Sequence, residues 1–98
     1  MHEEALLRDL LRKIDEVARR QGVRRVTGVS VWIGALSHLS PAWLRGRWEL
    51  ATAGSIAAGA RLTVRLSTDA ADPRAAGVVL ETVEAAEEPP AGEDGRPS

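Results

Sequence analysis

The chain has 98 residues, a formal net charge of −1 and no cysteine. This length is typical of one domain with a thin core, and the missing cysteine excludes disulfides, thiolate zinc clusters and cysteine nucleophiles. The balanced charge argues against binding to nucleic acid or to an anionic membrane, and no segment approaches the roughly 18 apolar residues of a membrane span. The first residues are charged and lead into an amphipathic pattern rather than a secretory signal, so we expect a cytoplasmic protein.

Residues 3–21 are predicted to form an amphipathic helix. Apolar side chains recur at steps of three and four residues from Leu7 to Ala18, with charged residues between them. Two glutamates at its start suit the helix dipole, and Gly22 is a typical helix stop.

Residues 27–34 are predicted to form a strand with one apolar face. Alternate residues of the strand share that face: Val29, Val31 and Ile33. Trp32 points to the opposite side. Val26 breaks the alternation, which indicates an irregularity near Gly28, where glycine permits a bulge.

The next segment, GALSHLSP, is predicted to be a loop that leads into a helix over residues 41–53. Ser40 suits the N-cap position and Pro41 the first helical position. Ser37 and Ser40 flank His38, but serines before a helix usually cap or turn. No residue pair here makes a nucleophile and its base, so we predict no enzymatic activity and no catalytic residue.

Two further strands are predicted, over residues 61–67 and 78–84, joined by the polar connection TDAADPRAAG at 68–77. The apolar face of the last strand is ambiguous. These two strands can pair antiparallel through the connection. Residues 85–98, rich in Pro, Gly and acidic side chains, are predicted to be a disordered acidic tail.

The predicted fold class is therefore α/β, in the order helix, strand, helix, strand, strand. The first two strands and the helix between them fit a right-handed parallel crossover. Both helices have one apolar stripe, which favours a small three-stranded mixed sheet with two helices packed on one face. The other face of the sheet is expected to be open.

His2 is the residue with the most distinctive chemistry. The α-amine of Met1, the amide nitrogen of His2 and its imidazole can close fused chelate rings on one metal ion, and Glu3 can add a contact. Nitrogen donors in a near-planar array suit Ni(II) or Cu(II). The alternative is a frayed terminus with a solvated histidine, and the residues alone leave both open.

Trp32 is the second candidate, on the open face beside arginines such as Arg65. It is either an exposed anchor for a partner or a ring that lies across arginine stems and stabilises the sheet. His38 is read as a solvated loop histidine, with a supplementary metal ligand as the alternative.

The chain resembles the HypA family of nickel metallochaperones for [NiFe]-hydrogenase maturation. The resemblance rests on an initial Met-His-Glu, on a V-x-V-x-I-G-x-L-S stretch at residues 29–37, on Pro41, and on the Gly54-Ser55 step. It covers roughly residues 1–68 and resumes at 78–84.

The resemblance implies a nickel-binding α/β domain over residues 1–84, with Met1, His2 and Glu3 as the Ni(II) ligands. The family's zinc domain, normally held by two CxxC pairs, is replaced here by the short loop 68–77, so we expect no structural zinc. A HypB-type GTPase and a hydrogenase large subunit are the implied partners. A homodimer is left open.

The leading hypothesis is a nickel metallochaperone that binds Ni(II) at its Met-His-Glu terminus and delivers it for hydrogenase maturation. The alternative is a metal-independent scaffold of hydrogenase assembly that docks through the open sheet face around Trp32 and Arg65.

Overall fold

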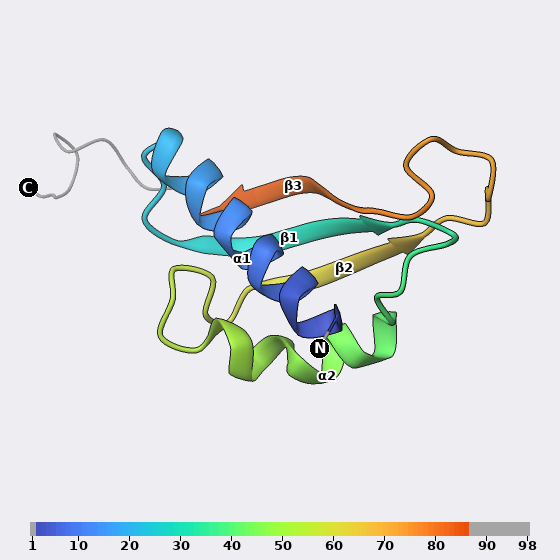
Figure 1. The fold of residues 1–98 in the computed structure, drawn as a ribbon. Helices are drawn as coiled ribbons and strands as arrows, with labels where there is room; N and C mark the ends of the chain where they lie inside the picture. The colour runs from blue at the N-terminus through green and yellow to red at the C-terminus, as the bar shows by residue number, and fades with distance from the viewer. Residues whose placement is uncertain (1, 87–98) are drawn as a thin grey trace, which may run out of the picture.

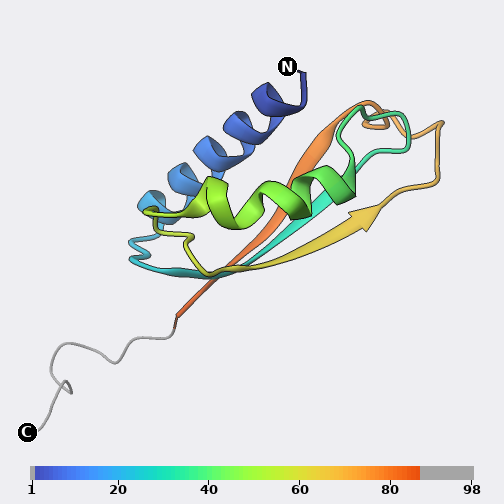
Figure 2. The same ribbon diagram turned by 90° about the horizontal axis from the view of Figure 1, so that it is seen from below.

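A computed structural model describes residues 2–86, apart from the side chain of His2, and has two helices on one face of a three-stranded sheet (Figure 1). The elements are α1 (His2–Arg20), β1 (Val26–Ile33), α2 (Pro41–Thr52), β2 (Arg61–Leu66) and β3 (Val78–Ala85). Figure 2 shows both helices on the same side of the sheet. The predicted α/β class, element order and mixed sheet are confirmed, and each element ends within one residue of its predicted bounds.

The strand order is β2-β1-β3, with β1 parallel to β2 and antiparallel to β3. The predicted pairing of the last two strands with each other is therefore wrong. The connecting segment does not turn back as a hairpin but crosses the end of β1. Ser67 donates to the Ile33 carbonyl and Gly34 donates to the Gly77 carbonyl, each at 2.9 Å, so β1 has a partner on both sides.

The core lies between the helices and the inner face of the sheet. The predicted apolar face of β1 is confirmed, and the side chains packed against it are buried: Val29, Val31, Ile33, Leu10, Ile14 and Leu44. Trp48 of α2 joins them, and its indole N–H donates to the Ala60 carbonyl at 2.8 Å. This bond satisfies the one polar atom that the indole carries into the core.

Two bulges explain the irregular patterns of β1 and β3. The register shifts between Val26 and Gly28, which confirms the irregularity predicted there. It shifts again between Ser30 and Val31, whose partners are Thr82 and Leu80, so Glu81 is the extra residue. Side chains on both sides of this bulge can therefore pack against the core: Val78, Leu80 and Val83. The ambiguous alternation of the last strand follows from this extra residue.

Within the described residues, α1 is the longest helix, and its outer side carries several ion pairs. No helix in this part of the chain is both long and apolar enough to cross a membrane. Residues 87–98, most of the predicted tail, lie outside the described residues, and β3 extends one residue past the predicted end of the last strand, through Ala85.

Candidate metal site at the amino-terminal turn

Two of the three predicted nickel ligands, His2 and Glu3, belong to the first turn of α1. The helix begins at His2, and Glu3 and Glu4 follow in its first turn. The peptide N–H groups of a first helical turn have no acceptor within the helix. The N–H of His2 therefore donates no hydrogen bond within the helix. This suits a nitrogen that must lose its proton when it binds a metal. Met1 and the side chain of His2 lie outside the described residues.

The carboxylates of this turn favour a bound cation, whereas the helix dipole opposes it. The positive end of the helix dipole opposes a bound cation by about 0.3–1 kcal/mol, and nearby carboxylates offset this effect. Glu3 is half-buried and Glu4 is exposed. Glu4 forms an ion pair with Arg47 of α2, with 3.4 Å between its carboxylate and the guanidinium. This ion pair links the first turn of α1 to α2.

The loop before α2 places both candidate serines in structural roles. Ser37 accepts from the Leu39 N–H at 3.2 Å, and Ser40 caps α2 by accepting from the Trp43 N–H at 3.2 Å. The interpretation of these serines as turn and cap residues is confirmed. His38 lies exposed between them. In the part of the chain that is described, no three His, Asp or Glu residues are gathered closely enough to hold a metal ion.

Trp32 lies on the open sheet face, as predicted, but it is only 7% exposed. Of the two alternatives left open for Trp32, the exposed anchor is therefore wrong. The guanidinium carbon of Arg74 stands 4.5 Å from the centre of the ring, at cation–π distance. The alternative of a ring covered by an arginine holds, but the arginine comes from the 68–77 segment. A partner-binding role for Trp32 stays a prediction.

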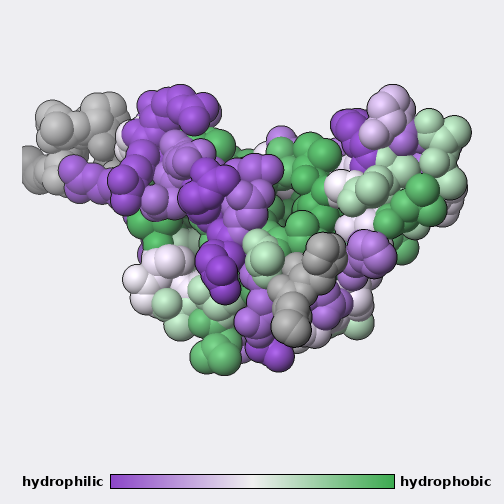
Figure 3. Space-filling model, in the orientation of Figure 1, coloured by the Kyte–Doolittle hydropathy of each residue, from purple (hydrophilic) through white to green (hydrophobic). Residues whose placement is uncertain are grey.

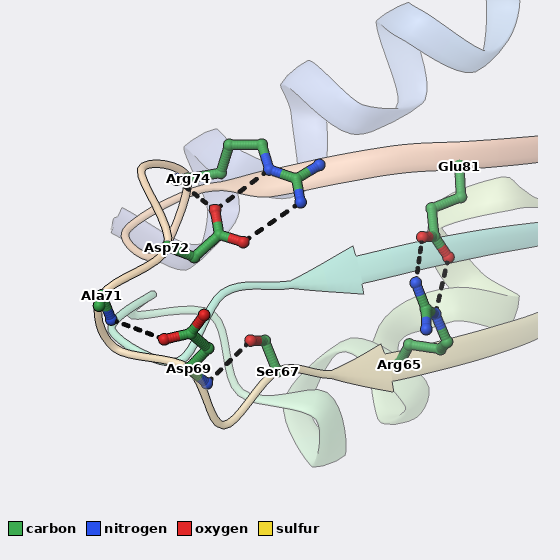
Figure 4. Close-up of polar contacts among 7 residues, drawn as sticks. All are labelled: Arg65, Ser67, Asp69, Ala71, Asp72, Arg74 and Glu81. Atoms are coloured by element: carbon green, nitrogen blue, oxygen red, sulfur yellow. Dashed lines mark hydrogen bonds and ion pairs between the residues drawn. The ribbon is translucent and has the colours of Figure 1, made fainter.

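Arg65 forms a two-bond ion pair with Glu81 across the open face (Figure 4). The distances are 3.2 Å from Nε to Oε1 and 2.7 Å from Nη2 to Oε2. These hydrogen bonds raise the pKa of Arg65 and lower the pKa of Glu81. The pair joins β2 to β3 over the central strand, so Arg65 is already engaged within the chain.

The 68–77 segment is ordered by its own short-range contacts. Figure 4 shows two successive turns, in which the Ser67 hydroxyl accepts from the Asp69 N–H and the Asp69 carboxylate accepts from the Ala71 N–H. Asp72 then accepts from both the backbone and the guanidinium of Arg74, which lowers the pKa of Asp72. Arg74 could not be predicted as a site residue from the sequence, because nothing local indicates which ring it covers.

A family model described as "Hydrogenase/urease nickel incorporation, metallochaperone, hypA" matches residues 1–87. The chain belongs to the HypA family. Among curated relatives, "Hydrogenase maturation factor HypA 2" of Bradyrhizobium diazoefficiens is 39% identical over 64 residues, which are 65% of this chain and 57% of that protein. "Hydrogenase maturation factor HypA" of Rhodopseudomonas palustris is 42% identical over the same shares.

The match of this HypA-family chain therefore spans somewhat more than half the length of those curated relatives. Among solved structures, "Solution structure of the Ni metallochaperone HypA from Helicobacter pylori" superposes with a TM-score of 0.73 over 90% of this chain and 100% of that one. At 17% sequence identity the likeness shows a shared fold.

Proposed function

We propose that this chain carries Ni(II) for the maturation of a [NiFe]-hydrogenase. Three nitrogens bind the ion, the α-amine of Met1 and the amide and imidazole of His2, and Glu3 assists them. The observation that carries this proposal is the match of a family described by nickel incorporation to residues 1–87, a range that includes these three residues. The ion enters and leaves by ligand exchange, without a catalytic step.

Delivery follows from the same proposal. The resemblance assigns a HypB-type GTPase and the large subunit of the hydrogenase as partners, in the cytoplasm. Transfer needs ligands that a receiving protein can reach. Glu4, in the first turn of α1, is exposed to solvent. A terminal chelate is suited to transfer, because its donors can be displaced one at a time.

Replacing His2 by alanine is expected to lower the affinity for Ni(II) by roughly 100-fold or more, since losing even an outer-shell partner of a metal ligand costs about 10–100-fold. The measurement is a calorimetric titration of protein that begins at Met1, verified by intact mass and prepared without an amino-terminal tag. His38→Ala is the matched control and is expected to bind as the unchanged protein does. Equal affinities in the unchanged protein and His2→Ala would remove the proposal.

We further propose that the fold needs no structural zinc. The segment between β2 and β3 is held by its own hydrogen bonds and by the Arg74–Trp32 contact. Treatment with a strong chelator is therefore expected to leave the Tm within about 1 °C of its starting value, whereas zinc-dependent domains unfold when their metal is removed. Thermal unfolding followed by circular dichroism measures this. A chelator-induced fall of several degrees would show that a resident metal stabilises the fold.

A further inference from the structure

A groove runs along β3, between this strand and the second half of α1. It consists of two hollows of about 380 and 310 Å³ that share Val17 and Leu80. Further apolar lining comes from β3 itself: Val78, Val79 and Val83. Figure 1 shows β3 at one edge of the sheet. Figure 3, in the same orientation, shows hydrophobic surface between the hydrophilic outer side of α1 and the connection from β2 to β3. An apolar hollow therefore lies directly beside an edge strand.

The outer edge of β3 has no partner strand among the described residues, because the strand order is β2-β1-β3. Residues of an antiparallel pair alternate between bonding to the partner strand and facing away from it. The N–H of Gly34 in the chain leaving β1 donates to the Gly77 carbonyl at 2.9 Å. Val79 therefore bonds to β1, and the N–H and C=O groups of Val78 and Leu80 face outwards. Such a row of groups is a template for pairing with another strand.

The two edges of the sheet differ in their protection against such pairing. On the β2 side, the guanidinium of Arg45 donates to the Leu62 carbonyl at 3.3 Å, and β2 itself carries Arg61 and Arg65. Charged side chains on an edge strand deter the addition of another strand. The first residues of β3, Val78–Leu80, include neither a charge nor a proline. The β3 edge is therefore the one suited to accept a strand.

We propose that β3 binds an extended segment of a partner protein, which adds to the sheet and turns its apolar side chains into the groove beside α1. In this mode of recognition, main-chain hydrogen bonds supply affinity and the pockets for alternate side chains supply specificity. The groove fits no helix or folded surface as closely, because its one polar wall is the row of strand N–H and C=O groups.

The charges of the groove add a preference for one acidic side chain in the segment. Arg20 is exposed and lines the groove, and it takes part in no ion pair within residues 3–86. Glu16, one turn earlier, is held instead by Arg12 at 2.8 Å, and Lys13 pairs with Asp9 at 3.2 Å. A carboxylate among the apolar side chains of the segment pairs with Arg20.

Titration with synthetic peptides, followed by NMR of the backbone amides, tests this proposal. The probes are blocked peptides of about eight residues, a common strand length, that alternate valine with threonine. One valine at a time is replaced by glutamate or by glutamine. The best glutamate peptide is expected to bind roughly threefold more tightly than its glutamine counterpart, as one exposed ion pair allows. Arg20→Gln is expected to remove this difference. Arg19→Gln is the matched control and is expected to keep it, because Arg19 pairs with Asp15 and lies outside the lining of both hollows.

Strand addition has its own test in hydrogen exchange. Saturation with peptide is expected to slow the exchange of the Leu80 amide at least about tenfold, because that N–H becomes a donor to the segment. The Val79 amide, already bonded to β1, is expected to stay unchanged. Methylation of alternate peptide nitrogens is expected to abolish binding in one phase and to spare it in the other, since only alternate residues of the segment bond to β3.

Failure of every peptide to bind, exchange at Leu80 that the peptide does not slow, or a glutamate preference that survives Arg20→Gln would overturn the proposal. It would also be overturned if the chain covered this edge itself. The signs of that are self-association that protects the Leu80 amide without peptide, and peptide binding that requires removal of residues 87–98. None of these measurements involves nickel, so they are independent of the proposed carrier function.

Discussion

Gly34→Ala is expected to destabilise the protein by about 3 kcal/mol, a large effect for one added methyl group. Gly34 lies where the chain leaves β1, and its N–H donates to the Gly77 carbonyl at 2.9 Å. A methyl group here would overlap the carbonyl of Ala75 and stand 2.7 Å from the carbonyl oxygen of Arg74. Both obstacles are backbone atoms, so relief requires the whole 68–77 segment to move off the end of β1.

Two other glycines provide controls for this prediction. Gly46 lies in α2 with no atom within 4 Å of an added methyl group, so Gly46→Ala is expected to stabilise the protein by about 1 kcal/mol through helix propensity. At Gly28 the atoms nearest to an added methyl group belong to the side chain of Glu84, whose carboxylate can rotate away, so the cost is expected to be smaller than at Gly34. Urea unfolding gives the three free energies. A Gly34→Ala protein as stable as Gly28→Ala would contradict the close packing of this segment.

Local patterns predicted the elements of this fold but not the pairing of its last strand. The alternation of β1 identified its buried face, because side chains on a strand must alternate. The position of β3 beside β1 depends on contacts between residues far apart in sequence, such as Gly34 with Gly77. The bulge at Glu81 has the same origin, since only the partner strand shows that one residue is extra.

Among the candidate site residues, too, local roles could be predicted and long-range contacts could not. The capping role of Ser40 could be predicted because a cap involves only the next three residues. Trp32 was placed on the correct face, but its burial depends on Arg74, 42 positions later in the chain. The role of Met1, His2 and Glu3 stays a prediction that rests on their chemistry and on the family, so it needs a test directed at the terminal amine itself.

Acetylation of the α-amine of Met1 is expected to lower the affinity for Ni(II) by about 100-fold or more, because it removes one of the three proposed nitrogen donors. The chain allows this modification to be made selectively. Lys13 is its only lysine, and Lys13→Arg keeps the contact with Asp9, which lies 3.2 Å from the lysine nitrogen. In that background the terminus is the sole primary amine, and intact mass confirms a single acetyl group.

The dependence of nickel affinity on pH follows from the same donor. A free α-amine has a pKa of about 8, and binding displaces its proton together with that of the His2 amide, so affinity falls as the pH drops below 8. In the Lys13→Arg protein we expect the affinity to fall at least about tenfold for each pH unit between 7.5 and 6. The acetylated protein has no amine proton to lose, so its residual binding is expected to change less steeply. Unchanged affinity after acetylation would exclude the amine as a donor and leave the imidazole of His2 to bind nickel with other ligands.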